Sequence, residues 1–166
     1  YGNIVIADGS GSSNQSSRSA VFSWVEGELL SALGMGSSFD LSGLSNSSLG
    51  TNDVKYRINQ YSALGILAKL YLNAEVYTGT DRYSDAAAAA GYIIDNGPYS
   101  LSDSGISVPN LGKRPAVSSD PDNLVGYAAI FAPNNENNPE IIWSVEYDEA
   151  TAGGMNFHHM TLHYAS

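Results

Sequence analysis

A window near the C-terminal end of the chain, residues 147–158, gathers aromatic, amide and carboxylate side chains. Aromatic rings stack on the apolar faces of sugar rings, while amides and carboxylates bond sugar hydroxyls. Gly153-Gly154 would let the backbone bend around a ligand. The candidate ligand contacts are Tyr147, Asp148, Met155, Asn156, Phe157 and His158. The competing interpretation is that Tyr147 and Phe157 only cover the edge of a core.

Three neighbouring acids, Glu146, Asp148 and Glu149, offer a catalytic alternative. On a strand, Glu146 and Asp148 would share one face about 7 Å apart, a spacing that fits an inverting pair of glycosidase carboxylates. Clustered acids are common on acidic proteins, however, and the chain has neither a Gly-x-Ser-x-Gly elbow nor a P-loop. We therefore predict no enzyme activity and no catalytic residues.

Two groups of residues raise the question of a metal. His159 and His163 are four apart, so one helix face could present both, but the Glu of a zincin motif is missing between them. The oxygen-rich stretch 134–138, with Glu136, could offer ligands to calcium but lacks the EF-hand spacing. We predict no metal and no cofactor, with calcium at 134–138 as the weaker alternative.

Composition narrows the class of partner. The chain has 166 residues, enough for one domain with a core, and 17 acidic against 7 basic residues give a net charge of -10. This charge disfavours nucleic acid and anionic lipid as partners. The absence of cysteine excludes disulfides and thiolate metal sites. Both ends read as the interior of a longer protein, because the chain opens on Tyr1 without a signal peptide and stops at Ser166 without a polar tail.

Apolar periodicity predicts a mainly α fold with three helices, over residues 19–33, 59–77 and 81–95. Serines before the first helix are plausible N-caps, and Gly34 is suited to end it. In the third helix the five-alanine run lets two backbones approach closely. The buried stripe that we expect there is Tyr83, Ala86, Ala87, Ala90 and Ile94.

The remaining elements are short and are joined by long loops rich in Gly, Ser and Asn. We predict a short helix over residues 123–131 and a strand over residues 140–147, in which apolar and polar residues alternate. Trp143 shares a strand face with Ile141 and Val145, so we expect it in the core. The run Ile4-Val5-Ile6 is the second β-like segment, which completes a short β-strand pair.

The second and third helices, with the Thr78-Gly79-Thr80 break between them, span about 34 residues, the length of a tetratricopeptide (TPR) repeat. Tyr61-x-x-Leu64-Gly65-x-x-Ala68 follows part of the TPR pattern, with Ala68 where Tyr is usual, and Pro98 closes the unit. The second helix is longer than a standard repeat helix. The sequence therefore predicts a TPR-like helical hairpin.

Further pieces occur in a defined order between residues 15 and 148. They are Gln15-x-x-Arg18-x-x-Val21-Phe22 with Glu26 and Glu28-Leu29, then Tyr56-Arg57-Ile58-Asn59, Leu67 to Tyr77 with Gly79, Tyr99-x-Leu101, Ile130-Phe131-Ala132 and Asn138-x-Glu140-Ile141-Ile142-Trp143. In this combination the chain resembles the central part of a SusD/RagB-type outer-membrane glycan-binding lipoprotein. It departs from the family's pattern at Tyr56-Arg57, which lacks an intervening Gly.

The resemblance implies that residues 1–166 form the central part of a larger SusD-like α/α superhelix. It implies non-catalytic capture of an oligosaccharide or polysaccharide and delivery to a SusC-like TonB-dependent transporter. The implied location is the extracellular face of the outer membrane of Bacteroidetes-type bacteria, through a lipid anchor absent from this chain. Family glycan contacts downstream of Glu140–Trp143 favour the 147–158 window. The alternative is a TPR-type protein-interaction scaffold without a sugar site.

Overall fold

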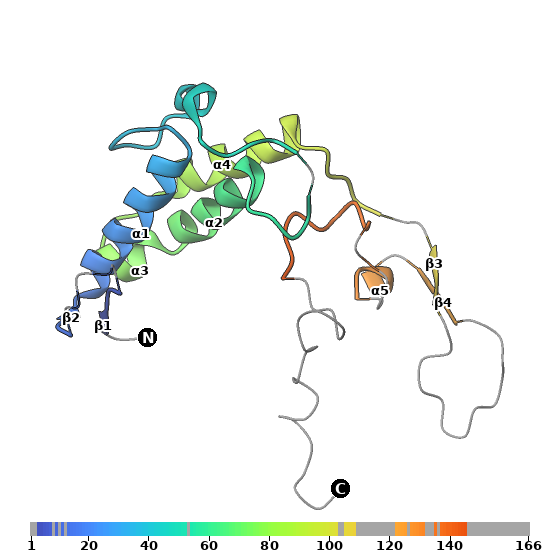
Figure 1. The fold of residues 1–166 in the computed structure, drawn as a ribbon, viewed down its shortest axis with the longest axis horizontal. Coiled ribbons are helices and arrows are strands. Elements are labelled where there is room, and N and C mark those ends of the chain that lie inside the picture. The colour runs from blue at the N-terminus through green and yellow to red at the C-terminus, as the bar shows by residue number, and fades with distance from the viewer. Residues whose placement is uncertain are drawn as a thin grey trace, which may run out of the picture.

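The computed structural model is mainly helical, as the periodicity predicted. It describes residues 3–7, 9, 11, 13–52, 54–102, 105–108, 122–125, 127–131, 135 and 137–145. Helices α1 to α4 gather at the end of the molecule that holds the N-terminus, and β3, β4 and α5 lie at the other end (Figure 1). The elements are β1 (Ile4–Val5), β2 (Gln15–Ser16), α1 (Arg18–Ala32), the 3₁₀ helix η1 (Leu41–Asn46), α2 (Gln60–Leu72), α3 (Ala74–Thr78), α4 (Tyr83–Asn96), β3 (Gly105–Val108), β4 (Asp122–Val125) and α5 (Tyr127–Ile130).

Helix α1 has the start and stop signals that the sequence predicted. The Ser17 side chain caps it by accepting a hydrogen bond from the Ala20 N–H at 3.2 Å. It ends where Gly34 adopts a left-handed backbone with φ 72°. Its buried face carries Phe22 and Leu30. The observed bounds differ from the predicted 19–33 by one residue at each end.

The predicted helix over 59–77 is divided into α2 and α3 at Asn73. Asn59 begins α2 through a reciprocal capping box with Ser62. At Asn73 the backbone leaves the helical region, with φ -103° and ψ 7°, and the side-chain amide donates to Lys69 O at 2.8 Å. An Asn side chain that bonds nearby carbonyls competes with the helix ladder. This competition accounts for the break that periodicity alone did not show.

Helix α4 lies beside α2 (Figure 1), but with a different face inward from the one predicted. Its buried residues are Ala86, Ala89 and Ile93. Ala86 is buried as predicted, but Tyr83 is 49 % exposed and Ile94 is 78 % exposed, so both ends of the predicted stripe were wrong. Five consecutive alanines carry little information about which face turns inward. The Tyr83 hydroxyl instead donates to Glu75 at 2.7 Å on the surface.

Two short antiparallel sheets flank the helices. In the first, β1 pairs with β2, with Ile4 opposite Ser16, which confirms β structure at Ile4–Val5. In the second, β3 pairs with β4, with Gly105 opposite Val125. The first half of the predicted helix over 123–131 therefore lies mostly in a strand, because Asp122–Val125 finds a partner there. Only Tyr127–Ile130 is helical.

The predicted strand over 140–147 is absent from its described part, residues 140–145. Asn138 starts a turn instead: its side chain accepts the Glu140 N–H at 2.9 Å, and its carbonyl accepts the Ile141 N–H at 3.2 Å. Alternation of side chains needs a neighbouring strand to become β structure, and no described strand pairs with this segment. Trp143 is 43 % exposed, so its predicted core position was also wrong.

The loop between α1 and α2 is held to the core by buried amides and by a close backbone crossing. The Gln60 side chain donates to Leu44 O at 3.3 Å and to Leu49 O at 3.0 Å. At the crossing, a Cβ on Gly43 would lie 2.6 Å from Gly34 O. Residue 43 must therefore be glycine, because a Cβ there would clash with backbone atoms that cannot move aside as a side chain could.

We expect Gly43→Ala to lower the free energy of unfolding by about 1–3 kcal/mol, the usual range for overpacking. Urea denaturation followed by circular dichroism measures this change. Gly27→Ala is the matched control: it lies inside α1, and a Cβ there meets nothing within 4 Å. That substitution should be neutral or stabilising, because alanine favours helix over glycine. Equal effects of the two substitutions would contradict the close crossing.

Candidate functional site

The ligand contacts that the sequence predicted all lie outside the described residues. They are Tyr147, Asp148, Met155, Asn156, Phe157 and His158. Glu146 and Glu149 of the catalytic alternative and the three histidines lie outside them too. The last described residue, Val145, is two positions before the window. The structure thus describes the segment that leads to residues 147–158. The role of those residues as ligand contacts stays a prediction.

Residues 137–145 run between the stretch that follows α4 and the loop that precedes α2. Hydrogen bonds from three serine N–H groups hold them in place. The donor and acceptor pairs are Ser100 N to Pro139 O (3.3 Å), Ser102 N to Glu140 Oε1 (2.7 Å) and Ser144 N to Lys55 O (2.8 Å). Each pair joins residues far apart in sequence. The segment that leads to the predicted window is therefore fixed relative to both helices.

This anchored segment forms one wall of a groove with a cavity of about 430 Å³. The groove is mostly apolar, with one carboxylate and two hydroxyls. Its lining residues are Ile93, Ile94, Tyr99, Ser100, Leu101, Glu140 and Ile142. Leu101 is 91 % exposed, so the groove opens to solvent over a large apolar side chain. An apolar wall with few polar groups is the usual make-up of a small-ligand site.

The Tyr99 ring is held from several sides. It meets the Tyr61 ring edge to face, with centroids 5.7 Å apart, and the Lys55 ammonium lies 4.7 Å from the Tyr99 centroid. Its hydroxyl accepts a hydrogen bond from the Asn59 side chain at 3.4 Å. A ring fixed in this way costs little entropy when a ligand packs on it. Tyr99 is thus a preorganised part of the groove.

Two further aromatic side chains, Tyr56 and Trp143, are exposed next to this site; we call them the aromatic pair. Their exposed fractions are 56 % and 43 %. The hydrogen bond between Ser144 and Lys55 brings their backbones together, because each aromatic residue is adjacent to one of the two bonded residues. Exposed rings of this size are the surfaces on which sugar rings stack.

Most of these residues were not selected from the sequence as ligand contacts. Tyr99, Leu101 and Glu140 entered only as pieces of the family pattern. They come together through contacts that bridge about forty residues, such as Ser102 to Glu140. The sequence feature that could have identified them is their position. Tyr99 and Leu101 follow the end of a helix, and loop residues on a rigid scaffold often bind ligands.

A smaller cavity of about 220 Å³ lies near β1, α1 and the end of α3. Its lining is largely apolar, with Arg18 at the start of α1.

In the described part of the chain, no group of three His, Cys, Asp or Glu residues gathers to hold a metal ion. At the calcium candidate, Asn134 and Glu136 lie outside the described residues. No helix among the described residues is long and apolar enough to cross a bilayer.

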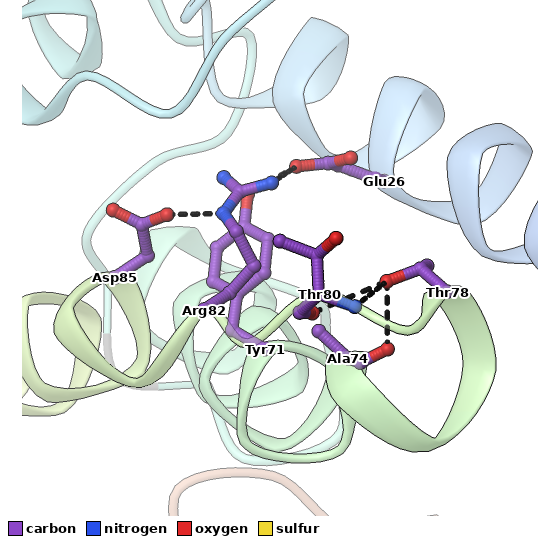
Figure 2. A network of polar contacts seen from close by, with 7 residues as sticks. All are labelled: Glu26, Tyr71, Ala74, Thr78, Thr80, Arg82 and Asp85. Carbon is purple, nitrogen blue, oxygen red and sulfur yellow. Dashed lines mark hydrogen bonds and ion pairs between the residues drawn. The ribbon is translucent and has the colours of Figure 1, made fainter.

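A second concentration of polar groups, the Arg82 cluster, consists of Glu26, Tyr71, Arg82 and Asp85 (Figure 2). The Arg82 guanidinium binds Glu26 Oε1 at 3.0 Å, pairs with Asp85, and lies 4.4 Å from the Tyr71 ring centroid. The Tyr71 hydroxyl donates to the same Glu26 oxygen at 2.9 Å. The cluster therefore ties α1, α2 and the start of α4 together.

The Arg82 cluster is structural because its charged groups are bonded to one another. Burial, followed by the hydrogen bond to Glu26 and the charge of that carboxylate, raises the pKa of Tyr71 above its ordinary value of 10.0. The adjacent turn is closed by Thr78, whose hydroxyl donates to Ala74 O at 2.9 Å (Figure 2). The groove, not this cluster, is the better candidate for ligand binding.

Comparison with known proteins assigns no family to this chain. No family model, no curated protein and no solved structure matches it. The fold and the groove thus define it only as a mainly helical protein with an open apolar groove.

We expect Tyr71→Phe to lower the free energy of unfolding by about 1–2 kcal/mol, since a partly buried hydrogen bond to a charged group is lost. Tyr83→Phe is the matched control. It removes the hydrogen bond from the exposed Tyr83 hydroxyl to Glu75, so stability should change little. Urea denaturation near neutral pH measures both variants. Equal losses would mean that Tyr71 gains nothing from its position.

The raised pKa of Tyr71 also predicts a pH dependence. The folded state favours the neutral phenol, so the contribution of Tyr71 is fully present below the ordinary pKa of 10.0 and is lost as pH rises through the higher folded value. The stability advantage of wild type over Tyr71→Phe should therefore shrink above about pH 10. Denaturation of both proteins across this range is the measurement, and a constant difference would contradict the linkage.

Proposed function

We propose that the protein captures oligosaccharides at the cell surface without catalysis and delivers them to a SusC-like TonB-dependent outer-membrane transporter. The observation that carries the proposal is the open groove at Tyr99, Leu101 and Glu140, with the aromatic pair beside it. The ordered family pattern along residues 15–148 supports the same function. Neither support depends on the 147–158 window, whose residues would add contacts to this site.

The groove offers the two kinds of contact that sugars need. Apolar contacts come from Ile94 and Leu101, which are 78 % and 91 % exposed and would lose water when a sugar ring covers them. Polar contact comes from Glu140, whose Oε1 accepts the Ser102 N–H. The other carboxylate oxygen is then available for a sugar hydroxyl. A hydrogen bond of this charged kind is stronger than one between neutral groups.

In this proposal, the helices act as the rigid platform of a TPR-like superhelix, and only the end of α4, at Ile94, contacts the sugar. The pairing of α2 with α4 is consistent with a helical hairpin: Tyr61 donates to Asn96 O at 2.8 Å, and Gly65 faces Ile93. Residues 1–166 would then be the central part of a larger SusD-like domain. The extracellular location and the lipid anchor belong to the same proposal.

A protein-interaction scaffold is the second candidate function, and one observation favours it. Leu72 and Val76, in α2 and α3, are 61 % and 67 % exposed although both are large and apolar. Tyr77, the residue after Val76, is 40 % exposed. Exposed apolar side chains that lie close together often mark a protein contact. A scaffold would bind through this surface, with no need of the groove.

The pair Leu101→Ala and Leu72→Ala separates the two functions. Both side chains are exposed, so both variants should keep the stability of the wild type. We expect Leu101→Ala to weaken oligosaccharide binding about fivefold, because apolar contact area is lost on one wall of the groove. Leu72→Ala should bind oligosaccharide like the wild type. Isothermal titration of the intact protein against a panel of neutral and acidic oligosaccharides is the measurement.

The outcome that favours the scaffold is the reverse: Leu72→Ala loses a protein partner, and no oligosaccharide binds any variant. Co-purification from outer membranes adds an independent readout. Recovery of a TonB-dependent transporter with the tagged intact protein is expected. If neither an oligosaccharide nor a transporter is bound, the proposed function is wrong.

A further inference from the structure

Basic side chains are scarce in this protein, so their positions carry information. The chain has 7 basic against 17 acidic residues, and five of the basic residues lie in the described part. Arg82 is paired with Glu26 and Asp85. Two of the remaining four, Lys55 and Arg57, flank Tyr56 in the loop that precedes α2. This loop therefore brings two basic side chains within three residues on an acidic molecule, with Asp53 two positions before Lys55.

The loop holds its basic residues beside the groove. The Arg57 N–H closes a turn by donating to Val54 O at 3.0 Å, and the Lys55 carbonyl accepts the Ser144 N–H. The Lys55 ammonium is already placed over the Tyr99 ring of the groove. Arg57 is exposed, and its side chain makes no ion pair within the described part of the chain. Its guanidinium is therefore available to a ligand.

The aromatic pair borders the same loop. Tyr56 lies between the two cations in sequence, and Trp143 is adjacent to Ser144, the residue bonded to Lys55. The two exposed aromatic residues and the exposed Arg57 thus come from one backbone junction, at Lys55 and Ser144, which offers both a stacking surface and an anion partner. In residues 137–145 the single carboxylate is Glu140, which binds the Ser102 N–H in the groove beyond Tyr99. Within residues 137–145, Trp143 is therefore accompanied by no acid other than Glu140.

We infer that the captured glycan is anionic: a sugar unit stacks on Tyr56 and Trp143 while its carboxylate or sulfate binds Arg57. This inference rests on the proposed glycan capture and names its substrate class. Arginine suits the role because its planar fork binds carboxylate and sulfate-like oxygens bidentately. A net charge of -10 repels anions at long range, so an acidic glycan needs a local cation of this kind to be held.

The test compares charged and uncharged forms of the same sugar chains. The probes are a tetragalacturonate with its fully methyl-esterified form and a sulfated galactan tetrasaccharide with its desulfated form. Titrations use the intact wild-type protein, Arg57→Gln and Lys69→Gln. Lys69 is exposed on α2, so its variant is the control for the same change in net charge. We expect the wild type to prefer a charged probe over its uncharged form by about fivefold or more.

Arg57→Gln should abolish this preference, and Lys69→Gln should retain it. Whichever charged probe binds more tightly assigns the anion as carboxylate or sulfate. Trp143→Leu should weaken the charged and uncharged forms alike, since it removes the stacking surface. Circular dichroism checks that each variant is folded.

Two results would overturn the inference while glycan capture stands. One is equal affinity for the charged and uncharged forms, and the other is a preference that survives Arg57→Gln. Binding of neutral glucans alone would have the same meaning. Failure of every glycan to bind would remove the proposed function, and the inference with it.

Discussion

The side chain of Asn59 is 1 % exposed, and its hydrogen bonds connect the helical core to the candidate site. Its oxygen accepts the Ser62 N–H at 2.8 Å, and its amide donates to Asn52 O at 3.0 Å and to the Tyr99 hydroxyl at 3.4 Å. A buried amide left unbonded is costly, so these contacts form together or not at all. One residue thereby fixes the start of α2, the preceding loop and the ring in the groove.

Tyr99 in turn helps to position residues further from the core, through weaker contacts. The Lys55 ammonium rests on the Tyr99 ring, and the Lys55 carbonyl holds Ser144. Each step moves the chain further from the core and toward solvent, yet each acts on residues that are already ordered. A site on loops gains precision when rigid helices fix the ends of those loops. This arrangement explains how an open groove without regular strands can keep a defined shape.

The helices were predictable because their signals are local. Periodicity and capping residues such as Ser17 and Asn59 lie within one or two turns of the elements that they define. The inward face of α4 was not predictable, since alanines look alike on every side. The alternation around Trp143 suggested a strand, but pairing depends on a neighbour that the local sequence does not contain. The break at Asn73 depended on a side-chain bond to Lys69 O that competes with the ladder.

The candidate site was harder to predict than the helices for the same reason. The Ser102 to Glu140 bond joins residues 38 apart, and no periodic pattern marks either of them. The Arg82 cluster shows the contrast: its charged side chains, Glu26, Arg82 and Asp85, are already bonded to one another. The groove and the loop beside it contain less charge but leave Leu101, Trp143 and Arg57 facing water. Apolar side chains that a ligand can shield from water, and charged groups that a ligand can pair, are therefore better guides to function in this fold than the density of charge.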